Sequence, residues 1–163
     1  MSQTTKNLLQ SLILFVSGTI IIIFLYVYFL VKLELEYLNV YIAGIGGIQL
    51  DDWVDKFRYL TINRNMWTAI ICVFLWYVYG QFICNLNEWQ KSKQFVKWFL
   101  LFVVTVGSVV VAIYETPVAE EGLLLAYSFY FINSSILYYI ITLLFSPPSF
   151  KYTPPLARFV RHW

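Results

Sequence analysis

The side chains that most often carry out chemistry, cysteine and histidine, are few and widely separated in this chain. Cys72 and Cys84 are the only two cysteines, and on one helix they would lie about 18 Å apart at a rise of about 1.5 Å per residue. A disulfide needs Cα atoms within about 7 Å of each other, and a thiol oxidoreductase needs closely spaced cysteines. The single histidine, His162, falls in the C-terminal tail. We therefore expect no thiol redox, haem, zinc or copper chemistry from this chain alone, and no enzyme activity.

Amides and hydroxyls are the remaining candidates, and the strongest group is Asn133-Ser134-Ser135, in the middle of an apolar run. In hydrocarbon, Asn133 must hydrogen-bond to another helix, a bound molecule or water. Small residues elsewhere would let helices approach closely. These side chains either join helices or line a polar path. The candidates for helix packing or pore lining are Gly80, Gly107, Ser108, Asn133, Ser134 and Ser135.

Four long apolar runs must position these side chains: residues 9–31, 66–84, 95–114 and 122–145. None contains Asp, Glu, Lys or Arg, and each is long enough for a bilayer, which needs about 20 apolar residues. The chain is 60% hydrophobic and 12% charged, against about 25% charged for a soluble globular protein. We predict an all-α integral membrane protein, a single domain over residues 1–163 with four transmembrane helices. The absence of charge inside the runs argues against an ion pump or secondary transporter acting alone.

Basic residues near the helix ends predict the orientation, because they favour the cytoplasmic side of a membrane. More of them fall inside if the N-terminus is cytoplasmic. The inner residues are then Lys6, Lys91, Lys93, Lys97, Lys151, Arg158 and Arg161, and the outer ones are Lys32, Lys56, Arg58 and Arg64. We therefore predict that both termini are cytoplasmic. Most acidic residues then lie on the outer side.

The first outer loop, residues 32–65, is long enough to need structure of its own. Leu50, Trp53, Val54, Phe57 and Leu60 recur at helical spacing, which predicts an amphipathic helix over about residues 50–60. We interpret it as a helix lying flat at the outer interface, where Trp53 and Phe57 would contact lipid or a partner. The alternative is that these two rings cap the top of the helix bundle.

A Pro-rich amphipathic tail, residues 146–163, is expected at the cytoplasmic surface. Pro147 and Pro148 should end the fourth helix, because neither can donate a backbone hydrogen bond. Beyond them, apolar and basic side chains would occupy opposite faces of a short helix, which suits anionic lipid headgroups or a partner subunit. The docking candidates in this tail are Arg158, Phe159, Arg161 and Trp163.

Aromatic residues make up 20% of the chain, and several fall deep inside the apolar runs. Their indole and phenol groups need hydrogen-bond partners there, which other helices would supply. The alternative is that they line a site for a lipid, quinone or pigment, although no cofactor is evident from the sequence. The deep aromatic residues are Trp76, Tyr77, Tyr79, Tyr127, Tyr130, Tyr138 and Tyr139.

Two classes of function fit these patterns. The first is a non-catalytic multi-pass subunit of a larger membrane complex, in an energy-converting, secretion or transport assembly. The second is a homo-oligomeric pore, or a channel-modulating four-helix protein of the immunity type. Membrane lipids and other integral membrane subunits are the expected partners; the formal net charge of +2 and the lack of a basic run argue against nucleic acid, and no metal is expected. We expect a bacterial plasma membrane, with an organellar inner membrane or a thylakoid as alternatives.

Overall fold

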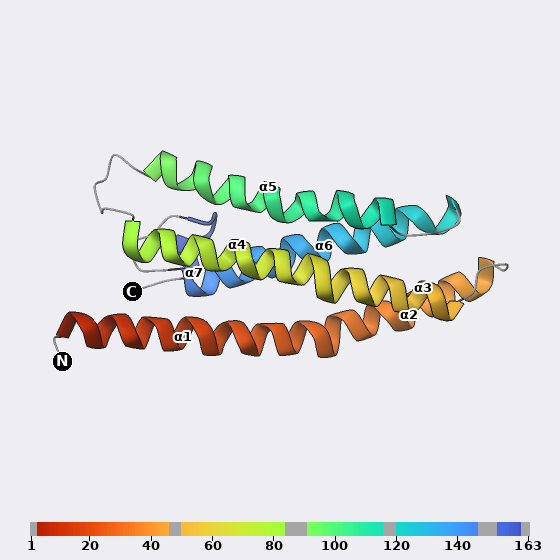
Figure 1. The fold of residues 1–163 in the computed structure, drawn as a ribbon, viewed down its shortest axis with the longest axis horizontal. Helices are drawn as coiled ribbons and strands as arrows, with labels where there is room; N and C mark the ends of the chain where they lie inside the picture. The colour runs from red at the N-terminus through yellow and green to blue at the C-terminus, as the bar shows by residue number, and fades with distance from the viewer. Residues whose placement is uncertain (1–2, 46–49, 84–90, 116–119, 147–152, 161–163) are drawn as a thin grey trace.

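A computed structural model describes residues 3–45, 50–83, 91–115, 120–146 and 153–160 of the chain. Within these ranges nearly every residue is helical and no strand occurs. The long helical runs lie side by side along one direction, so the molecule is an elongated bundle (Figure 1). The predicted all-α class is confirmed.

The first run is one unbroken helical rod made of α1 (Gln3–Leu25), the π-helical segment η1 (Tyr26–Val31) and α2 (Lys32–Ile45). The sequence analysis ended this helix at residue 31 and placed the following residues in an outer loop. That boundary is wrong. Leu and Glu, which favour helix, dominate the start of α2, and no Gly or Pro occurs between Lys32 and Gly44, so a single charge at Lys32 does not stop the helix.

A second rod follows, made of α3 (Leu50–Tyr59), the π-helical segment η2 (Leu60–Met66), α4 (Trp67–Val78) and η3 (Tyr79–Ile83). The predicted helix over residues 50–60 therefore exists. It is not a separate element, because it continues without interruption into α4. The predicted loop over residues 32–65 is instead largely the end of one rod and the start of the next, which pack against each other through α2 and α3.

The remaining long helices are α5 (Lys91–Glu115) and α6 (Glu120–Phe145). They match the runs predicted over 95–114 and 122–145, with a few polar residues added at their ends. In the described part of the tail, residues 153–160, one helix occurs, the four-residue α7 (Ala157–Val160). Residues 147–152 and 161–163, with Pro147, Pro148, Arg161 and Trp163, lie outside the described residues.

Within the described residues, three helices are long and apolar enough to cross a membrane: Thr5–Tyr37, Lys93–Tyr114 and Tyr127–Phe145. The described part of the rod that contains α4 is not among them. Large apolar side chains such as Ile13, Phe24 and Val104 are exposed along the outside of the bundle. Such an outer surface fits association with a membrane.

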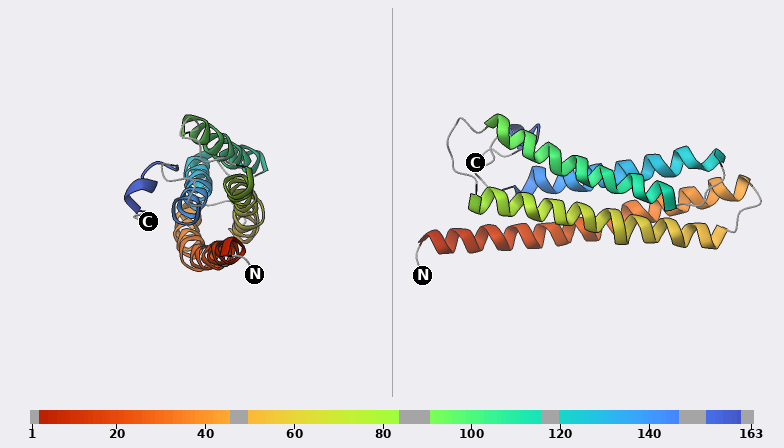
Figure 2. Two further views of the ribbon diagram at one scale, coloured as in Figure 1. Left: turned by 90° about the vertical axis from the view of Figure 1, so that its left-hand side faces the viewer. Right: turned by 45° about the horizontal axis from the view of Figure 1, so that its top comes forward.

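The end-on view in Figure 2 shows the four rods around a common centre. Helix α6 packs against α1, α4 and α5, and α4 also packs against α5. The rod α1 begins at the same end of the bundle at which α7 lies (Figure 1). Helix α6 is therefore the element through which the other rods are connected.

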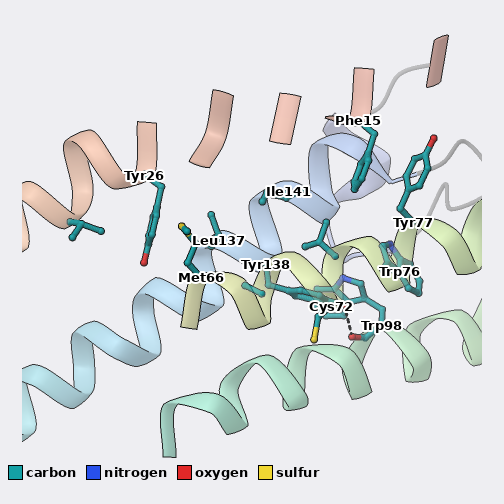
Figure 3. Close-up of a cluster of buried hydrophobic side chains, with 13 residues drawn as sticks. Phe15, Tyr26, Met66, Cys72, Trp76, Tyr77, Trp98, Leu137, Tyr138 and Ile141 are labelled. Atoms are coloured by element: carbon teal, nitrogen blue, oxygen red, sulfur yellow. Dashed lines mark hydrogen bonds between the residues drawn. The ribbon is translucent and has the colours of Figure 1, made fainter. Parts of the chain in front are cut away.

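Buried aromatic rings from α1, α4, α5 and α6 form the main apolar core (Figure 3). Their polar atoms find partners on other helices, as the sequence analysis expected. Trp76 Nε1 donates to Ser146 Oγ at 2.7 Å, and Trp98 Nε1 donates to Thr142 Oγ1 at 3.0 Å. Tyr138 Oη donates to the carbonyl of Trp98 at 3.0 Å. The indole and phenol groups therefore fix how α4 and α5 sit on α6.

Candidate functional site

A layer of buried polar side chains lies between two apolar clusters in the bundle. One cluster gathers Phe57, Leu60 and Tyr130 with small residues of α5, and the other is the aromatic core that includes Met66 and Leu137. On each rod, polar residues lie between the residues that belong to one cluster and those that belong to the other. We call the following residues the polar layer: Glu34 of α2, Thr61 and Asn65 of η2, Ser108 of α5, and Asn133 and Ser134 of α6.

Glu34 is the acidic member of this layer, and it is 6% exposed. Asn133 Nδ2 donates a hydrogen bond to Glu34 Oε2 at 2.6 Å. No Lys or Arg side chain in the described ranges forms an ion pair with this carboxylate. The sequence analysis placed Glu34 in an outer loop and expected no charge among the helices, and both expectations are wrong because the first rod continues through α2.

The helical register turns Glu34 inward. Tyr26 and Val31 are buried on the same side of the rod, while Lys32 and Glu36 point outward and pair with each other at 3.9 Å with more than half of each side chain exposed. Tyr26 extends toward Met66 and Leu137 (Figure 3). The first rod therefore places both a phenol and a carboxyl in the interior of the bundle.

Several buried polar atoms of the polar layer have no hydrogen-bond partner within the protein. They are Asn133 Oδ1, Thr61 Oγ1, Asn65 Nδ2 and Ser134 Oγ. Asn133 Oδ1 belongs to the amide that contacts Glu34, so it lies within about 5 Å of the carboxylate by covalent geometry. Buried polar groups without partners are rare in proteins, and each one needs an explanation. A ligand with affinity for oxygen is one such explanation.

The placement of Thr61 follows from the packing one turn earlier. The rings of Phe57 and Tyr130 stack with centroids 5.0 Å apart. The rods that carry these two rings run in the same direction (Figure 1). Thr61 follows Phe57 by four residues and Ser134 follows Tyr130 by four residues, so Thr61 and Ser134 lie at the same level of the bundle. Both side chains are almost completely buried, so both hydroxyls belong to the interior of the bundle.

The segment η2 holds the other side of the layer. Ser108 Oγ donates to Asn65 Oδ1 at 3.2 Å and also to the carbonyl of Thr105 at 2.7 Å. Short π-helical segments within α-helices are frequent at functional sites, and η2 carries both Thr61 and Asn65. A π-helical turn is wider than an α-helical turn, and this changes which side chains face inward. Thr61 and Asn65 therefore lie on the side of η2 that packs against α5 and α6.

The packing candidates from the sequence divide into two groups. Asn133, Ser134 and Ser108 belong to the polar layer, Ser135 has a buried hydroxyl without a protein partner, and Gly80 is buried. Gly107 is different. It is exposed, and nothing lies within 4 Å of the position a Cβ would take, so it does not mediate a close helix contact.

Close approach occurs instead at Gly18, which the sequence analysis did not select. A Cβ at this position would overlap the ring of Phe145 at the end of α6. The contact brings α1 against α6 about two turns from the hydrogen bond between Ser11 and Tyr77, which joins α1 to α4 at 2.9 Å. A single glycine in an apolar helix is the sequence signal for such a close approach, but the sequence does not show that Phe145 is the residue it faces.

The predicted docking residues have mixed outcomes. Phe57 is fully buried against Tyr130, which is the position that the alternative, a cap of the bundle, gives to this ring. Phe159 is 71% exposed and remains available for docking. The side chains of Trp53 and Arg158, and all of Arg161 and Trp163, lie outside the described part of the structure.

The chemistry of the layer is that of oxygen ligands around one negative charge. Among the described residues no three His, Cys, Asp or Glu side chains gather as they would around a metal ion. A single carboxylate with amide and hydroxyl oxygens suits a monovalent cation better than a divalent one, which requires more negative charge. Comparison with known proteins finds no family model, no curated protein and no solved structure that matches this chain.

Proposed function

We propose that this chain is a non-catalytic multi-pass subunit of a cation-coupled membrane assembly, and that its polar layer binds the cation. The observation that supports this is Glu34, a carboxylate buried among helices and hydrogen-bonded to Asn133. An ionisable side chain among membrane helices is costly, and it commonly marks an ion path or a proton relay. A bound proton or Na⁺ would compensate its charge.

The subunit role follows from what surrounds this carboxylate. Among the residues whose side chains the structure describes, no other Asp, Glu, Lys or Arg is buried. One buried carboxyl makes a binding site, but a path across a membrane needs further polar positions. Other chains of the assembly would supply them. Copies of the same chain could do so in a ring, which is the homo-oligomeric pore kept as the alternative.

The proposal includes four membrane spans with both termini cytoplasmic. The rod that contains α4 would be the additional span, because it packs along α5 and α6 for most of its length. The start of α1 and the helix α7 lie at the same end of the bundle (Figure 1), and this supports an even number of membrane crossings. The bias of basic residues supports the direction. Labelling of cysteines introduced at Lys6 and Lys56 tests this, since only Lys56 should react from outside.

Partner identity is tested by extraction in mild detergent followed by native mass spectrometry. A subunit should be recovered with unlike chains in a fixed ratio. A single species that contains several copies of this chain alone would instead support the homo-oligomeric pore. Recovery only as a monomer under the mildest conditions would contradict both.

Cation binding is tested by thermal unfolding of the purified assembly. A ligand present at about 100 times its Kd stabilises the folded state by about 2.7 kcal/mol. We expect NaCl, compared with choline chloride at equal ionic strength, to raise the melting temperature if the cation is Na⁺, and pH to change it if the cation is a proton. Glu34→Gln should remove the response, and Glu36→Gln, an exposed neighbour on the same helix, should keep it. Equal responses in the two variants would contradict cation binding at Glu34.

A further inference from the structure

A groove of about 350 Å³ opens on the outside of the bundle, where the first rod meets the second. Its walls come from α1, η1 and α2 on one side and from α3 and η2 on the other. Six of its eight lining residues are apolar or aromatic. The lining residues are Phe24, Val27, Tyr28, Val31, Lys32, Leu35, Arg58 and Ile62.

The groove has two chemically different ends. The two rods run in opposite directions and meet through α2 and α3. Lys32 is closer to that junction than Phe24, and Arg58 is closer to it than Ile62. Both cationic side chains therefore lie toward the junction end, together with Leu35, and the other apolar residues extend away from them.

The apolar part is long enough for a lipid chain. From Lys32 to Phe24 the helix covers about 12 Å at a rise of about 1.5 Å per residue. One leaflet of hydrocarbon is about 15 Å thick, as half of about 30 Å. The rings of Phe24 and Tyr28 stack with centroids 5.8 Å apart, which gives this part of the groove a continuous aromatic wall.

The cationic end can hold an anion. Arg58 is exposed. Lys32 is more than half exposed, and its one ion pair, with Glu36, is long at 3.9 Å; exposed pairs of this kind hold little free energy and exchange readily. Guanidinium and ammonium groups at one place suit a phosphate, which the guanidinium can bind through two parallel hydrogen bonds.

We propose that this groove binds one anionic phospholipid from the surrounding membrane. The headgroup phosphate lies between Lys32 and Arg58, and one acyl chain follows Phe24, Val27 and Ile62. The match between a charged end and an apolar path identifies an amphiphile as the occupant. The site is separate from the polar layer, because Glu34 faces the interior of the bundle and Lys32 faces outward.

The test is native mass spectrometry of the protein released from nanodiscs that contain equal amounts of phosphatidylglycerol and phosphatidylcholine. The wild type should retain phosphatidylglycerol preferentially. The double variant Lys32→Gln/Arg58→Gln should lower that preference by about thirtyfold, as expected for two basic groups at a membrane surface. The control Lys6→Gln/Lys56→Gln removes the same charge from exposed positions outside the groove and should keep the preference.

A second variant tests the apolar path without any change of charge. Val27→Trp places a large ring in the groove and should reduce retention of both lipids, while the bundle remains folded by circular dichroism. The proposal is wrong if the wild type retains the two lipids equally, or if the groove variant and the control lose phosphatidylglycerol to the same extent. It is also wrong if Val27→Trp leaves retention unchanged.

Discussion

Asn133 and Glu34 are 99 residues apart in the chain, and the amide nitrogen of Asn133 lies 2.6 Å from a carboxylate oxygen of Glu34. The contact joins the middle of α6 to α2 inside the bundle. It uses one donor of the amide and leaves Asn133 Oδ1 without a partner in the protein. The pair therefore both connects two rods and presents an oxygen for a ligand.

The first prediction concerns this pair. Asn133→Leu leaves the buried Glu34 carboxylate without its donor, and we expect it to lower the free energy of unfolding by about 1–3 kcal/mol. Replacing both residues by leucine should restore part of the loss, because no unsatisfied polar group then remains. Thermal unfolding in detergent measures both variants. If the double variant is as unstable as the sum of the two single ones, the residues are not coupled.

The second prediction concerns the contact at Gly18. Gly18→Leu should lower the free energy of unfolding by about 1–3 kcal/mol, because the new side chain displaces the ring of Phe145. Phe145→Ala in the same chain should recover part of it. Gly107→Leu is the matched control, since that glycine faces open space, and it should not destabilise the protein. The relevant measurement is the melting temperature of each variant.

The third prediction concerns the indole hydrogen bonds of the aromatic core. Trp76→Phe removes the donor to Ser146, and Trp98→Phe removes the donor to Thr142. Each should cost about 0.5–1.5 kcal/mol, the net contribution of a typical intramolecular hydrogen bond. Trp67, which is 53% exposed, provides the control, and Trp67→Phe should change the unfolding free energy by less than either core variant. Equal losses in all three would show that ring size matters and the hydrogen bonds do not.

The fourth prediction distinguishes a bundle role from a surface role for α3. Phe57 is fully buried and Tyr59, two residues on, is exposed. Phe57→Ala should therefore cost about 3–5 kcal/mol, as for truncation of a buried aromatic side chain. Tyr59→Ala should change the unfolding free energy by no more than about 0.5 kcal/mol. The reverse order would mean that α3 lies on the membrane surface.

Composition and periodicity were sufficient for the helical class and for α5 and α6, since long uncharged apolar runs allow few other structures. The need of buried indole and phenol groups for hydrogen-bond partners was also predictable from the sequence, and Trp76 and Tyr138 both have such partners. Their partners were not predictable, because a single sequence does not show which faces of distant helices meet. Phe57 illustrates this, since its spacing fits both a surface helix and a buried one.

The boundary at residue 31 failed for a different reason. A charge at Lys32 ends an apolar run, but a helix ends where its backbone is interrupted or capped. The signal that was available is the stretch from Lys32 to Ala43, which contains no Gly or Pro. This signal would have placed Glu34 within the first helix, but it would not have identified Asn133 as the residue that Glu34 contacts. The π-helical turns, which shift the register at Thr61 and Asn65, have no sequence signal that we can identify.

The length of the first rod has a consequence for the shape of the protein in its membrane. The span Thr5–Tyr37 contains 33 residues, or about 50 Å of helix, whereas the hydrocarbon layer is about 30 Å thick. A straight helix of this length must either tilt strongly in the membrane or extend beyond the hydrocarbon layer. If upright, it carries the ends of α2 and α3 that lie beyond Lys32 and Arg58 past the headgroups as a rigid projection, within reach of water-soluble proteins that never enter the bilayer.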